Sequence, residues 1–417
     1  MLKNLIKLNI FIFLTINLNF TPIFATQNTH NTHKIFMVTG ETSAEQIGAW
    51  YLTLRQAPVY AKASSGRQGE RDGENPIKCE AIGGQNLQKA GAQIYDNYKN
   101  LILGAVGPIQ FIKNLPDRWY GLKILSNYIL ENNFSEVILI DCPLTNIPLM
   151  YKLKKSKPEI KITYIAPPEM WIWGKWGLDY FFKNYSDKTI VVYPFEANWY
   201  KKQGLETEFL GWPGYEKIKP YLDANTKKEN KIALCPGSRK SEIKIMLPIF
   251  LEVAQIISKK HPEISFILPI AEYISKEQIE QEIKKYNLKN KIEVIKDDEK
   301  LFEKLSSCCI AISKPGTITL FLALLKIPTI ITFKIPLITY LMAKLIFQKS
   351  YVGLPNLFLD KEVFKELIQG ECNVKMLTKE IDKLYQEFTS NSERYQKTLT
   401  DLEEIKIKLN PQNINSP

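Results

Sequence analysis

Short apolar runs rich in β-branched residues alternate with longer amphipathic stretches from Lys34 onward. The clearest strand and helix pairs are KIFMVTG with AEQIGAWYLTLRQ, EVILIDC with NIPLMYKLKK, and KTIVVYP with FEANWYKKQG. A strand that is followed by a helix, several times in succession, predicts a parallel sheet with helices on both faces. The pattern therefore predicts a doubly wound, Rossmann-like α/β domain over residues 34–218.

A second series of the same kind follows the lysine- and asparagine-rich connection GWPGYEKIKPYLDANTKKENK. Its main segments are KIALCPG, LPIFLEVAQIISKK, ISFILPI, KEQIEQEIKKY, KIEVIKD, CCIAISKPG, TLFLALLKI and PTIITFKI. They predict a second Rossmann-like domain over residues 219–376, and residues 377–417 predict a charged helical tail that packs on one of the domains. Two such domains would place the ends of their strands at a central cleft, where α/β proteins bind ligands.

The N-terminal residues 1–33 stand outside this pattern. Lys3 and Lys7 flank the start of an apolar run from Leu8 to Phe24, and the small residue Ala25 follows the run. This order is typical of a secretory signal, and the run is short for a membrane-spanning helix of about 20 residues. A cleaved signal, an uncleaved anchor and an apolar extension all remain open.

Two further segments interrupt the alternation. Residues 57–78 are polar and aperiodic, which predicts a surface insertion. The stretch from Ile335 to Phe347 is almost wholly apolar but too short to span a bilayer. It predicts a buried helix, with an exposed apolar patch that rests on a membrane or receives acyl chains as the alternative.

The charge balance limits the classes of ligand and partner that we expect. The formal charge of +11 arises from 55 Lys and Arg against 44 Asp and Glu in 417 residues, mostly as lysine on predicted helix faces. No basic segment is interleaved with aromatic residues as in a nucleic-acid module. The composition therefore favours a phosphorylated ligand or an anionic membrane surface over DNA or RNA.

Cysteine and histidine usage argues against a metal centre. The six cysteines, at positions 79, 142, 235, 308, 309 and 372, have no zinc-like spacing and predict buried, reduced core residues. Only three histidines occur, His30, His33 and His261, so that a histidine base or a metal cluster is not expected.

The segment CPGSRKSEIK carries the strongest chemical signal. An apolar strand precedes it and a helical pattern follows it, so that Gly237, Ser238 and Arg239 form a turn that opens a helix. Backbone N–H groups at a helix start lack intrahelical partners, and an arginine can bind phosphate oxygens through two N–H groups. The turn therefore predicts an anion site, with Gly237 allowing a phosphate to approach closely.

Three other turns place polar groups after predicted strands. After the first strand, Gly40 and Glu41 form a turn, with Ser43 as a helix cap. Asp141 follows four apolar residues and precedes a proline, which predicts an acid exposed at the cleft edge. The third turn, in ISKPGTITL, offers Gly316, Thr317 and Thr319 to sugar hydroxyls or a phosphate.

The order of these segments resembles a known family. The blocks that carry the resemblance are GETS, IGGQNLQKAG, LIDCPLTN, YIAPPEMWIW, VVYPFEANWYKKQG, FLGWP, IALCPGSRKSEIKIMLPIFLEVA, SKPGTITL and YVGLPNLFLDKEVFKELIQGEC. From about Lys34 to beyond Cys372 the chain resembles lipid-A-disaccharide synthase, glycosyltransferase family 19.

The resemblance implies a GT-B fold and a metal-independent, inverting enzyme without a cofactor. It implies that UDP-2,3-diacylglucosamine is joined to 2,3-diacylglucosamine 1-phosphate, with release of UDP, at the cytoplasmic face of the inner membrane. Asp141 is then the general base, and Arg239 stabilises the leaving diphosphate. The substrate-binding candidates are Gly40, Glu41, Ser43, Gly237, Ser238, Glu242, Gly316, Thr317, Thr319, Asn356, Glu366 and Gln369.

Several family positions differ in this chain. The family's Ser-Gly-Asp is Ser43-Ala44-Glu45, the second acid of IDxPD is Thr145, and the arginine after WxW is Gly174. In addition, GHP is Gly211-Trp212-Pro213, and the glutamate after GTxTL is Phe321. Two alternatives to an active synthase therefore stand: a noncatalytic lipid- or nucleotide-binding relative, and a GT-B enzyme that uses another UDP-sugar. Export by the N-terminus would separate an enzyme from cytosolic UDP-sugars, which favours a peripheral or N-terminally anchored protein.

Overall fold

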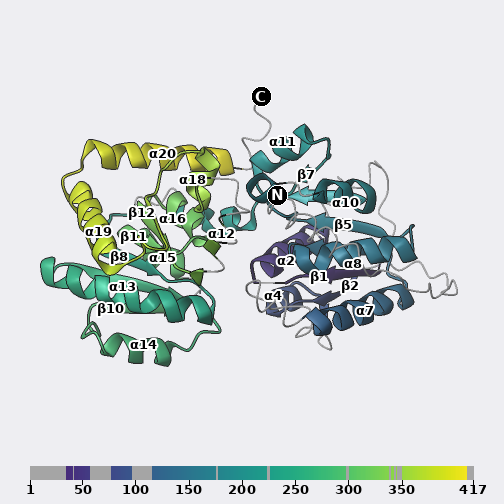
Figure 1. Ribbon diagram of the computed structural model, residues 1–417, viewed down its shortest axis with the longest axis horizontal. Coiled ribbons are helices and arrows are strands. Elements are labelled where there is room, and N and C mark those ends of the chain that lie inside the picture. The colour runs from purple at the N-terminus through teal and green to yellow at the C-terminus, as the bar shows by residue number, and fades with distance from the viewer. Residues whose placement is uncertain are drawn as a thin grey trace. The chain divides into compact units, whose positions relative to one another are not determined.

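The chain forms two compact units, seen in Figure 1. The computed structural model describes residues 34–40, 42–56, 77–95, 115–174, 177–222, 226–296, 300–337, 340–341, 344 and 350–410. The described residues up to Pro213 belong to the first unit, and those from Gly214 onward to the second. The predicted N-terminal signal or anchor, Glu41 and most of the predicted insertion lie outside the described residues.

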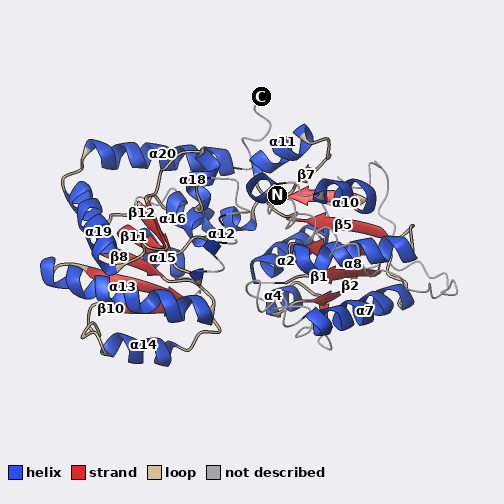
Figure 2. Cartoon of the chain, viewed as in Figure 1, coloured by secondary structure: helices blue, strands red, loops and turns tan. Residues whose placement is uncertain are grey.

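The first unit is a parallel sheet between helices, as Figure 2 shows by colour. Its strands are β1 (Lys34–Val38), β2 (Lys78–Ile82), β3 (Gln93–Ile94), β4 (Glu136–Ile140), β5 (Lys161–Ile165), β6 (Lys188–Val191) and β7 (Glu208–Phe209). Its helices are α2 (Thr42–Gln56), α4 (Gln85–Lys89), α7 (Leu115–Glu131), α8 (Pro143–Ser156), α9 (Met170–Trp173), α10 (Leu178–Tyr185) and α11 (Pro194–Lys202). The strand order is β3-β2-β1-β4-β5-β6-β7, with every pairing parallel.

The apolar residues of β1 explain why helices cover both faces of this sheet. Phe36 and Val38 are buried in a core with α7 and α8, which lie side by side in Figure 1. Ile35 and Met37 are buried in a second core with α2 and α4. Successive side chains of a strand point to opposite faces, so a continuous apolar run needs a helix layer on each side.

The second unit repeats the plan. Its strands are β8 (Glu229–Cys235), β9 (Ser265–Ile270), β10 (Ile292–Lys296), β11 (Cys308–Ser313), β12 (Thr329–Phe333) and β13 (Glu366–Ile368). Its helices are α12 (Pro213–Leu222), α13 (Lys240–Lys260), α14 (Lys276–Lys284), α15 (Leu301–Ser306), α16 (Ile318–Leu324), α18 (Leu354–Leu359), α19 (Val374–Thr389) and α20 (Glu393–Leu409). The strand order is β10-β9-β8-β11-β12-β13, again with every pairing parallel.

The predicted C-terminal tail corresponds to α19 and α20, which pack within the second unit. Leu377, Ile381 and Tyr385 of α19 are buried in the same core as α13 and strand β8. These residues recur every four positions and form an apolar stripe on one side of α19, through which the helix packs against the core. The predicted domain boundary after residue 218 falls inside α12, which belongs to the second unit from Gly214 onward.

Two doubly wound, Rossmann-like halves are therefore confirmed. In each sheet the strand order reverses at one point, between β1 and β4 in the first unit and between β8 and β11 in the second. Open α/β sheets bind ligands beyond the carboxyl ends of the strands at such a switch point. The fold thus directs attention to the turns that follow these four strands.

The apolar stretch that starts at Ile335 is not buried where its residues are described. The exposed fraction is 63% for Leu337 and 51% for Leu341, so the expectation of a buried helix is wrong for these two side chains. No apolar core surrounds them, and they face solvent. None of the helices in the described part of the chain has the length and hydropathy that crossing a bilayer requires.

The cysteine prediction is confirmed for five of the six thiols. Cys79, Cys235, Cys308, Cys309 and Cys372 are buried and form no disulfide. Cys142 is the exception, because it is partly exposed in the turn after β4.

Candidate functional site

The sequence-predicted turns follow the four strands at the two switch points. Gly40 and Asp141 lie just after β1 and β4 in the first unit. Gly237 and Gly316 lie just after β8 and β11 in the second. Within each unit the structure therefore brings two predicted turns to the edge of the sheet where ligands bind.

The turn at Asp141 has an unusual backbone. Asp141 and Cys142 have φ values of 52° and 46°, in the left-handed region that residues other than glycine rarely adopt. The Tyr164 hydroxyl donates to the Asp141 carbonyl at 2.6 Å. The buried Asn146 amide donates to the same carbonyl at 2.8 Å and to the Ile140 carbonyl at 3.1 Å. These bonds hold a strained turn, a feature that is common at functional sites.

A buried carboxylate, that of Glu196, lies at the start of α11, after β6. The Glu196 side chain accepts from the Trp171 indole at 3.1 Å and from the Tyr193 backbone N–H at 3.1 Å. Burial raises the pKa of Glu196 to about 8 despite these hydrogen bonds. Burial is also the main cause of a raised pKa at Tyr193, to which Glu196 and Asp141 add. Asp141, after β4, therefore acts electrostatically on the tyrosine that precedes α11, although Glu196 and Glu169 act on it more strongly.

The altered residue Thr145 has a specific partner. It is buried in α8, and its hydroxyl accepts from the Arg118 guanidinium of α7 at 3.3 Å. Burial lowers the pKa of Arg118, and Cys142 opposes this effect. The residue at the position of the family's second acid is therefore a threonine that contacts a cation.

After β1, the Glu45 carboxylate of helix α2 lies against Gly84. Helix α2 begins at Thr42, so the exposed Ser43 lies inside the first turn, and its predicted role as the cap is wrong. Gly40 is partly exposed. A Cβ atom at Gly84 would lie 2.6 Å from the Glu45 carboxylate oxygens, so Glu45 contacts the start of α4. The structure gives no geometry for Glu41.

The turn after β8 contains a network of charged side chains. Glu242, whose exposed fraction is 9%, accepts from the Arg239 backbone N–H at 3.2 Å and lies 3.4 Å from the Arg239 guanidinium. The Lys314 ammonium, from the end of β11, lies 2.8 Å from the same carboxylate oxygen, Oε1. Burial favours the neutral acid, but Lys314 and Arg239 outweigh it and lower the pKa of Glu242. Glu242 is therefore ionised and bonded to two cations.

The absence of a side chain at Gly237 leaves space for the Glu242 carboxylate. Its φ is 119°, and a Cβ atom there would lie 2.5 Å from Glu242 Oε2 and 3.0 Å from Lys314 Cδ. The prediction that the glycine makes room for a phosphate must therefore be corrected, because Glu242 and the Lys314 stem fill that space. Ser238 is exposed, and its carbonyl accepts from the Tyr273 hydroxyl at 2.8 Å.

The turn after β11 is open on one side. Gly316 has a φ of 153°, and a Cβ atom there would meet nothing within 4 Å. Thr317 is partly exposed beside it. Thr319 is fully buried, and its hydroxyl donates to the Gly316 carbonyl at 2.7 Å. Gly316 and Thr317 are accessible to a ligand, whereas Thr319 stabilises their turn.

Asn356, Glu366 and Gln369 form a clamp of hydrogen bonds within the second unit. The fully buried Asn356 donates to the Phe364 carbonyl and to Glu366, and accepts from two backbone N–H groups, which uses all its hydrogen-bonding positions. Glu366 also accepts from the Gly353 backbone at 2.9 Å. Gln369 bonds both the N–H and the carbonyl of Ile335. These side chains position two backbone segments, and Asn356 has no group left for a substrate.

Three other altered family positions have packing partners or backbone roles. Phe321 lies with its ring centroid 4.7 Å from that of Phe302. The buried Trp212 lies beside Tyr193, with ring centroids 6.2 Å apart. Gly174 ends α9 with a φ of 87°, which favours glycine. Phe321 and Trp212 therefore pack against other aromatic rings, where the family has a carboxylate and an imidazole.

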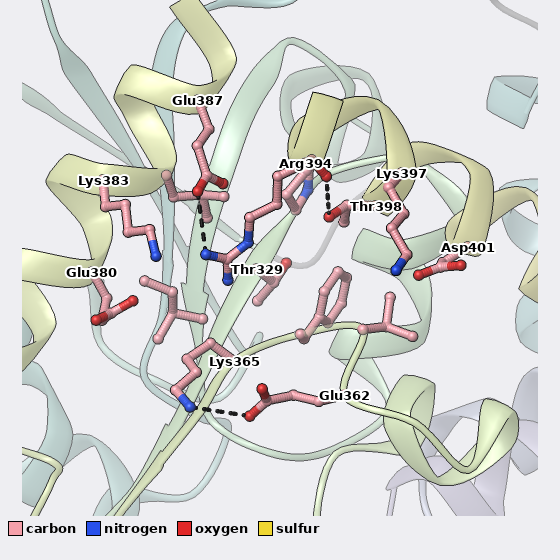
Figure 3. Close-up of a pocket in the computed structure, with 15 residues that line it drawn as sticks. Thr329, Glu362, Lys365, Glu380, Lys383, Glu387, Arg394, Lys397, Thr398 and Asp401 are labelled. Carbon is pink, nitrogen blue, oxygen red and sulfur yellow. Dashed lines mark hydrogen bonds and ion pairs between the residues drawn. The ribbon is translucent and has the colours of Figure 1, made fainter. Parts of the chain in front are cut away.

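A pocket of about 310 Å³ lies elsewhere on the second unit, as Figure 3 shows. It is lined by α19, α20 and the first residues of β12, at the amino end of that strand. Two ion pairs lie in its lining, Arg394 with Glu387 and Lys365 with Glu362, both at 3.3 Å. Because ligands of such sheets bind at the opposite, carboxyl edge, we assign the site to the switch-point turns. No group of ligating side chains suited to a metal ion occurs among the residues the structure describes.

The model of the lipid-A-disaccharide synthetase family matches residues 35–416. The chain belongs to this family. Curated relatives include a lipid-A-disaccharide synthase of Coxiella burnetii, 27% identical over 84% of this chain and 88% of that protein. Another is lipid-A-disaccharide synthase 1 of Legionella pneumophila, 28% identical over 85% of this chain and 88% of that protein. The recognition made from the sequence blocks is confirmed.

Solved structures agree on the fold. The S. aureus MnaA-UDP co-structure is similar with a TM-score of 0.54 at 11% identity, over 89% of this chain and 91% of that one. Together with the two parallel-sheet units, this similarity confirms the predicted GT-B fold. The family is one of glycosyltransferases, and lipid A synthesis is its named activity.

Three residues of the site were missed in the sequence. Lys314 could have been found as a basic residue between a strand and a Pro-Gly turn. Asn146 could have been found as a polar residue inside an apolar helix start, and Glu196 as the third residue of a helix after Tyr-Pro.

Proposed function

We propose that this chain is an inverting glycosyltransferase that joins UDP-2,3-diacylglucosamine to 2,3-diacylglucosamine 1-phosphate and releases UDP. The observation that carries the proposal is the charged turn of Arg239, Glu242 and Lys314 at the second switch point of a chain in this family. Such a turn is suited to the negative charge of a leaving diphosphate. The proposal includes no metal and no cofactor.

The first unit would supply the base. In the proposed step, the Asp141 carboxylate takes the proton of the acceptor hydroxyl as that oxygen bonds to the sugar carbon of the donor. The bond from that carbon to the diphosphate breaks, and the electron pair leaves with UDP. The bonds from Tyr164 and Asn146 to the Asp141 carbonyl favour this role, because they fix the backbone that carries the carboxylate.

The second unit would hold the donor. Arg239 would contact the diphosphate with N–H groups of the α13 start, while Gly316 and Thr317 are accessible for substrate contact. We assign Thr319, Asn356, Glu366 and Gln369 to positioning, since their side chains bond within the chain. Gly40, Ser43 and Ser238 remain candidates for substrate contact.

Acylated substrates also suggest where the protein meets the membrane. Leu337 and Leu341 are exposed, and Lys334 and Lys344, also exposed, are close in sequence. Apolar side chains near cations suit an anionic bilayer surface, here proposed as the cytoplasmic face of the inner membrane. Leu341→Asp should then weaken binding to anionic vesicles, and unchanged binding would remove this patch from the proposal.

The test is a transfer assay with both acylated substrates. Wild-type protein should form disaccharide and release UDP only when the acceptor is present. Asp141→Asn should lower turnover by about 10²- to 10⁴-fold without changing UDP affinity, because only proton transfer is lost. Asp117→Asn, an exposed aspartate of the same unit, is the matched control. If Asp141→Asn keeps full turnover, Asp141 is not the base.

A noncatalytic lipid- or nucleotide-binding relative is the second candidate. It is favoured by Thr145 in place of an acid and by Phe321, which packs on Phe302 where the family has a carboxylate. Binding of acylated ligand without turnover, unchanged in Asp141→Asn, would establish it. Transfer from a soluble, unacylated UDP-sugar would instead identify a different GT-B activity.

A further inference from the structure

Lys314 stands where the two central strands of the second sheet end. It follows β11, and its backbone N–H donates to the Cys235 carbonyl at the end of β8 at 3.0 Å. Its side chain has an exposed fraction of 18% and extends over Gly237, so that its ammonium lies 2.8 Å from Glu242. A lysine this well covered, with its head at the carboxyl edge of the sheet, is part of the site rather than of the solvated surface.

We propose that Lys314 is a second cation of the diphosphate site and that Glu242 holds it in place for the ligand. The inference rests on the proposed function and assigns Lys314 and Glu242 separate roles within the charged turn. One carboxylate oxygen of Glu242 is shared by Lys314 and Arg239, at 2.8 and 3.4 Å. Two cations and one carboxylate leave a net charge of +1 at this edge, which attracts an anion.

The hydrogen-bonding capacity of the ammonium supports this role. A lysine ammonium has three N–H donors, and Glu242 accepts one of them in this structure. Glu242 is fixed in turn by the Arg239 backbone N–H at 3.2 Å. The cation is therefore ordered before the ligand arrives, and ordering in advance reduces the entropy cost of binding.

The geometry also defines a competing role for Glu242. Its carboxylate lies over Gly237, where a phosphate would otherwise approach, so it could act as an internal substitute for the ligand. The open side of Gly316, with nothing within 4 Å of an added Cβ atom, leaves room for a ligand two residues along the chain from Lys314, outside the space that Glu242 fills over Gly237. The two roles predict opposite effects on affinity when the charge of Glu242 is removed.

The experiment measures the dissociation constants of UDP and of uridine by calorimetry with the full chain. Lys314→Met should weaken UDP binding by about 10- to 100-fold, the range for a lost charge-assisted hydrogen bond, and leave uridine binding unchanged. Lys304→Met is the matched control, because Lys304 is also paired with a glutamate, Glu293, at 3.1 Å in the same unit. It should leave both constants unchanged.

Glu242→Gln decides between the two roles. Weaker UDP binding supports a carboxylate that positions the cations, whereas tighter UDP binding overturns the proposal. The double variant Lys314→Met with Glu242→Gln removes the pair without leaving a buried charge, so it serves if the single lysine variant does not fold. It should also bind UDP weakly, and wild-type affinity in this variant would overturn the assignment.

The same measurements test the proposed function separately from the role of Lys314. If the wild type binds no UDP, the proposed function fails. If the wild type binds UDP and Lys314→Met binds it equally well, only the role of Lys314 fails.

Discussion

Glu196 in the first unit and Glu242 in the second occupy the same place in the same local motif. Each is the third residue of a helix that follows a strand, and each accepts the backbone N–H of the residue before the helix, at 3.1 and 3.2 Å. Yet the pKa of Glu196 is raised to about 8, chiefly by burial, while the pKa of Glu242 is lowered.

The two pKa values shift in opposite directions because each glutamate has a different second partner, which comes from elsewhere in the fold. Glu196 receives the neutral indole of Trp171, whereas Glu242 receives the ammonium of Lys314. A neutral donor does not compensate for a buried charge, but a cation does. The acid after β6 in the first unit therefore lies in a nearly neutral, aromatic environment, whereas the acid after β8, at the switch point of the second unit, lies in a charged one suited to an anion.

Gly237→Ala should have the largest effect, because the Glu242 carboxylate lies directly over that glycine. The substitution combines an unfavourable φ of 119° with a Cβ atom 2.5 Å from the carboxylate. We expect the free energy of unfolding to fall by about 3 kcal/mol, measured by chemical denaturation. UDP affinity should fall as well.

Gly316→Ala is the control for backbone strain. Its φ is also positive, at 153°, but an added Cβ atom meets nothing within 4 Å. It should cost less than the substitution at Gly237. Equal losses in the two variants would show that contact with Glu242 does not matter.

Glu196→Gln should change how stability depends on pH. A glutamate that titrates at 4.5 when unfolded and about 8 when folded keeps its proton in the folded state between those values. The folded state then binds more protons, so wild-type stability falls as pH rises through this window, by at most about 1.4 kcal/mol per pH unit. Glutamine cannot ionise, so the variant should lack this fall in denaturation series from pH 4.5 to 8. A parallel fall in both proteins would contradict the raised pKa.

The contribution of Glu242 to stability should depend on pH with the opposite sign to that of Glu196, and Glu242→Gln tests this. Because the folded pKa of Glu242 is lowered, its contribution is present above the unfolded value of 4.5 and is lost as the pH falls through the folded pKa. At neutral pH the variant leaves Lys314 without its carboxylate and should lose about 2 kcal/mol of stability. The difference from wild type should shrink in acid. A difference that is constant with pH would mean that the charge of Glu242 is not involved.

The sequence suffices to predict much of this architecture but not these partners. Short local patterns predict the four strands at the switch points and the helices that follow them, and the turns at Asp141 and Gly237 follow directly from where these strands end. The bond between Glu242 and Lys314 joins residues 72 positions apart, and the bonds between Gln369 and Ile335 span 34. Such pairings depend on which strands lie side by side in the sheet, and the local periodicity of each segment does not specify that order.

The same reason explains the clamp around Asn356. The resemblance alone makes Asn356, Glu366 and Gln369, in the segments LPNLFLDKEV and ELIQ, candidates for substrate binding. In the structure Asn356 bonds Glu366 and the backbone around it, which no local pattern reveals. A motif can therefore be retained for the shape of a site without touching the ligand.

Trp171→Phe should have the smallest effect. It tests the contribution of the neutral partner of Glu196, the Trp171 indole, in the comparison of Glu196 with Glu242. Phenylalanine keeps a ring against Phe195, whose centroid lies 4.8 Å from that of Trp171, but it has no N–H for Glu196. Loss of one hydrogen bond should cost about 1 kcal/mol in urea denaturation at pH 6, where Glu196 is mostly protonated. The cost should increase toward pH 9, because the ionised carboxylate depends more on its donors. Trp199→Phe, in the same unit, is the control, and an equal, pH-independent loss in both variants would mean that the indole does not stabilise the buried acid.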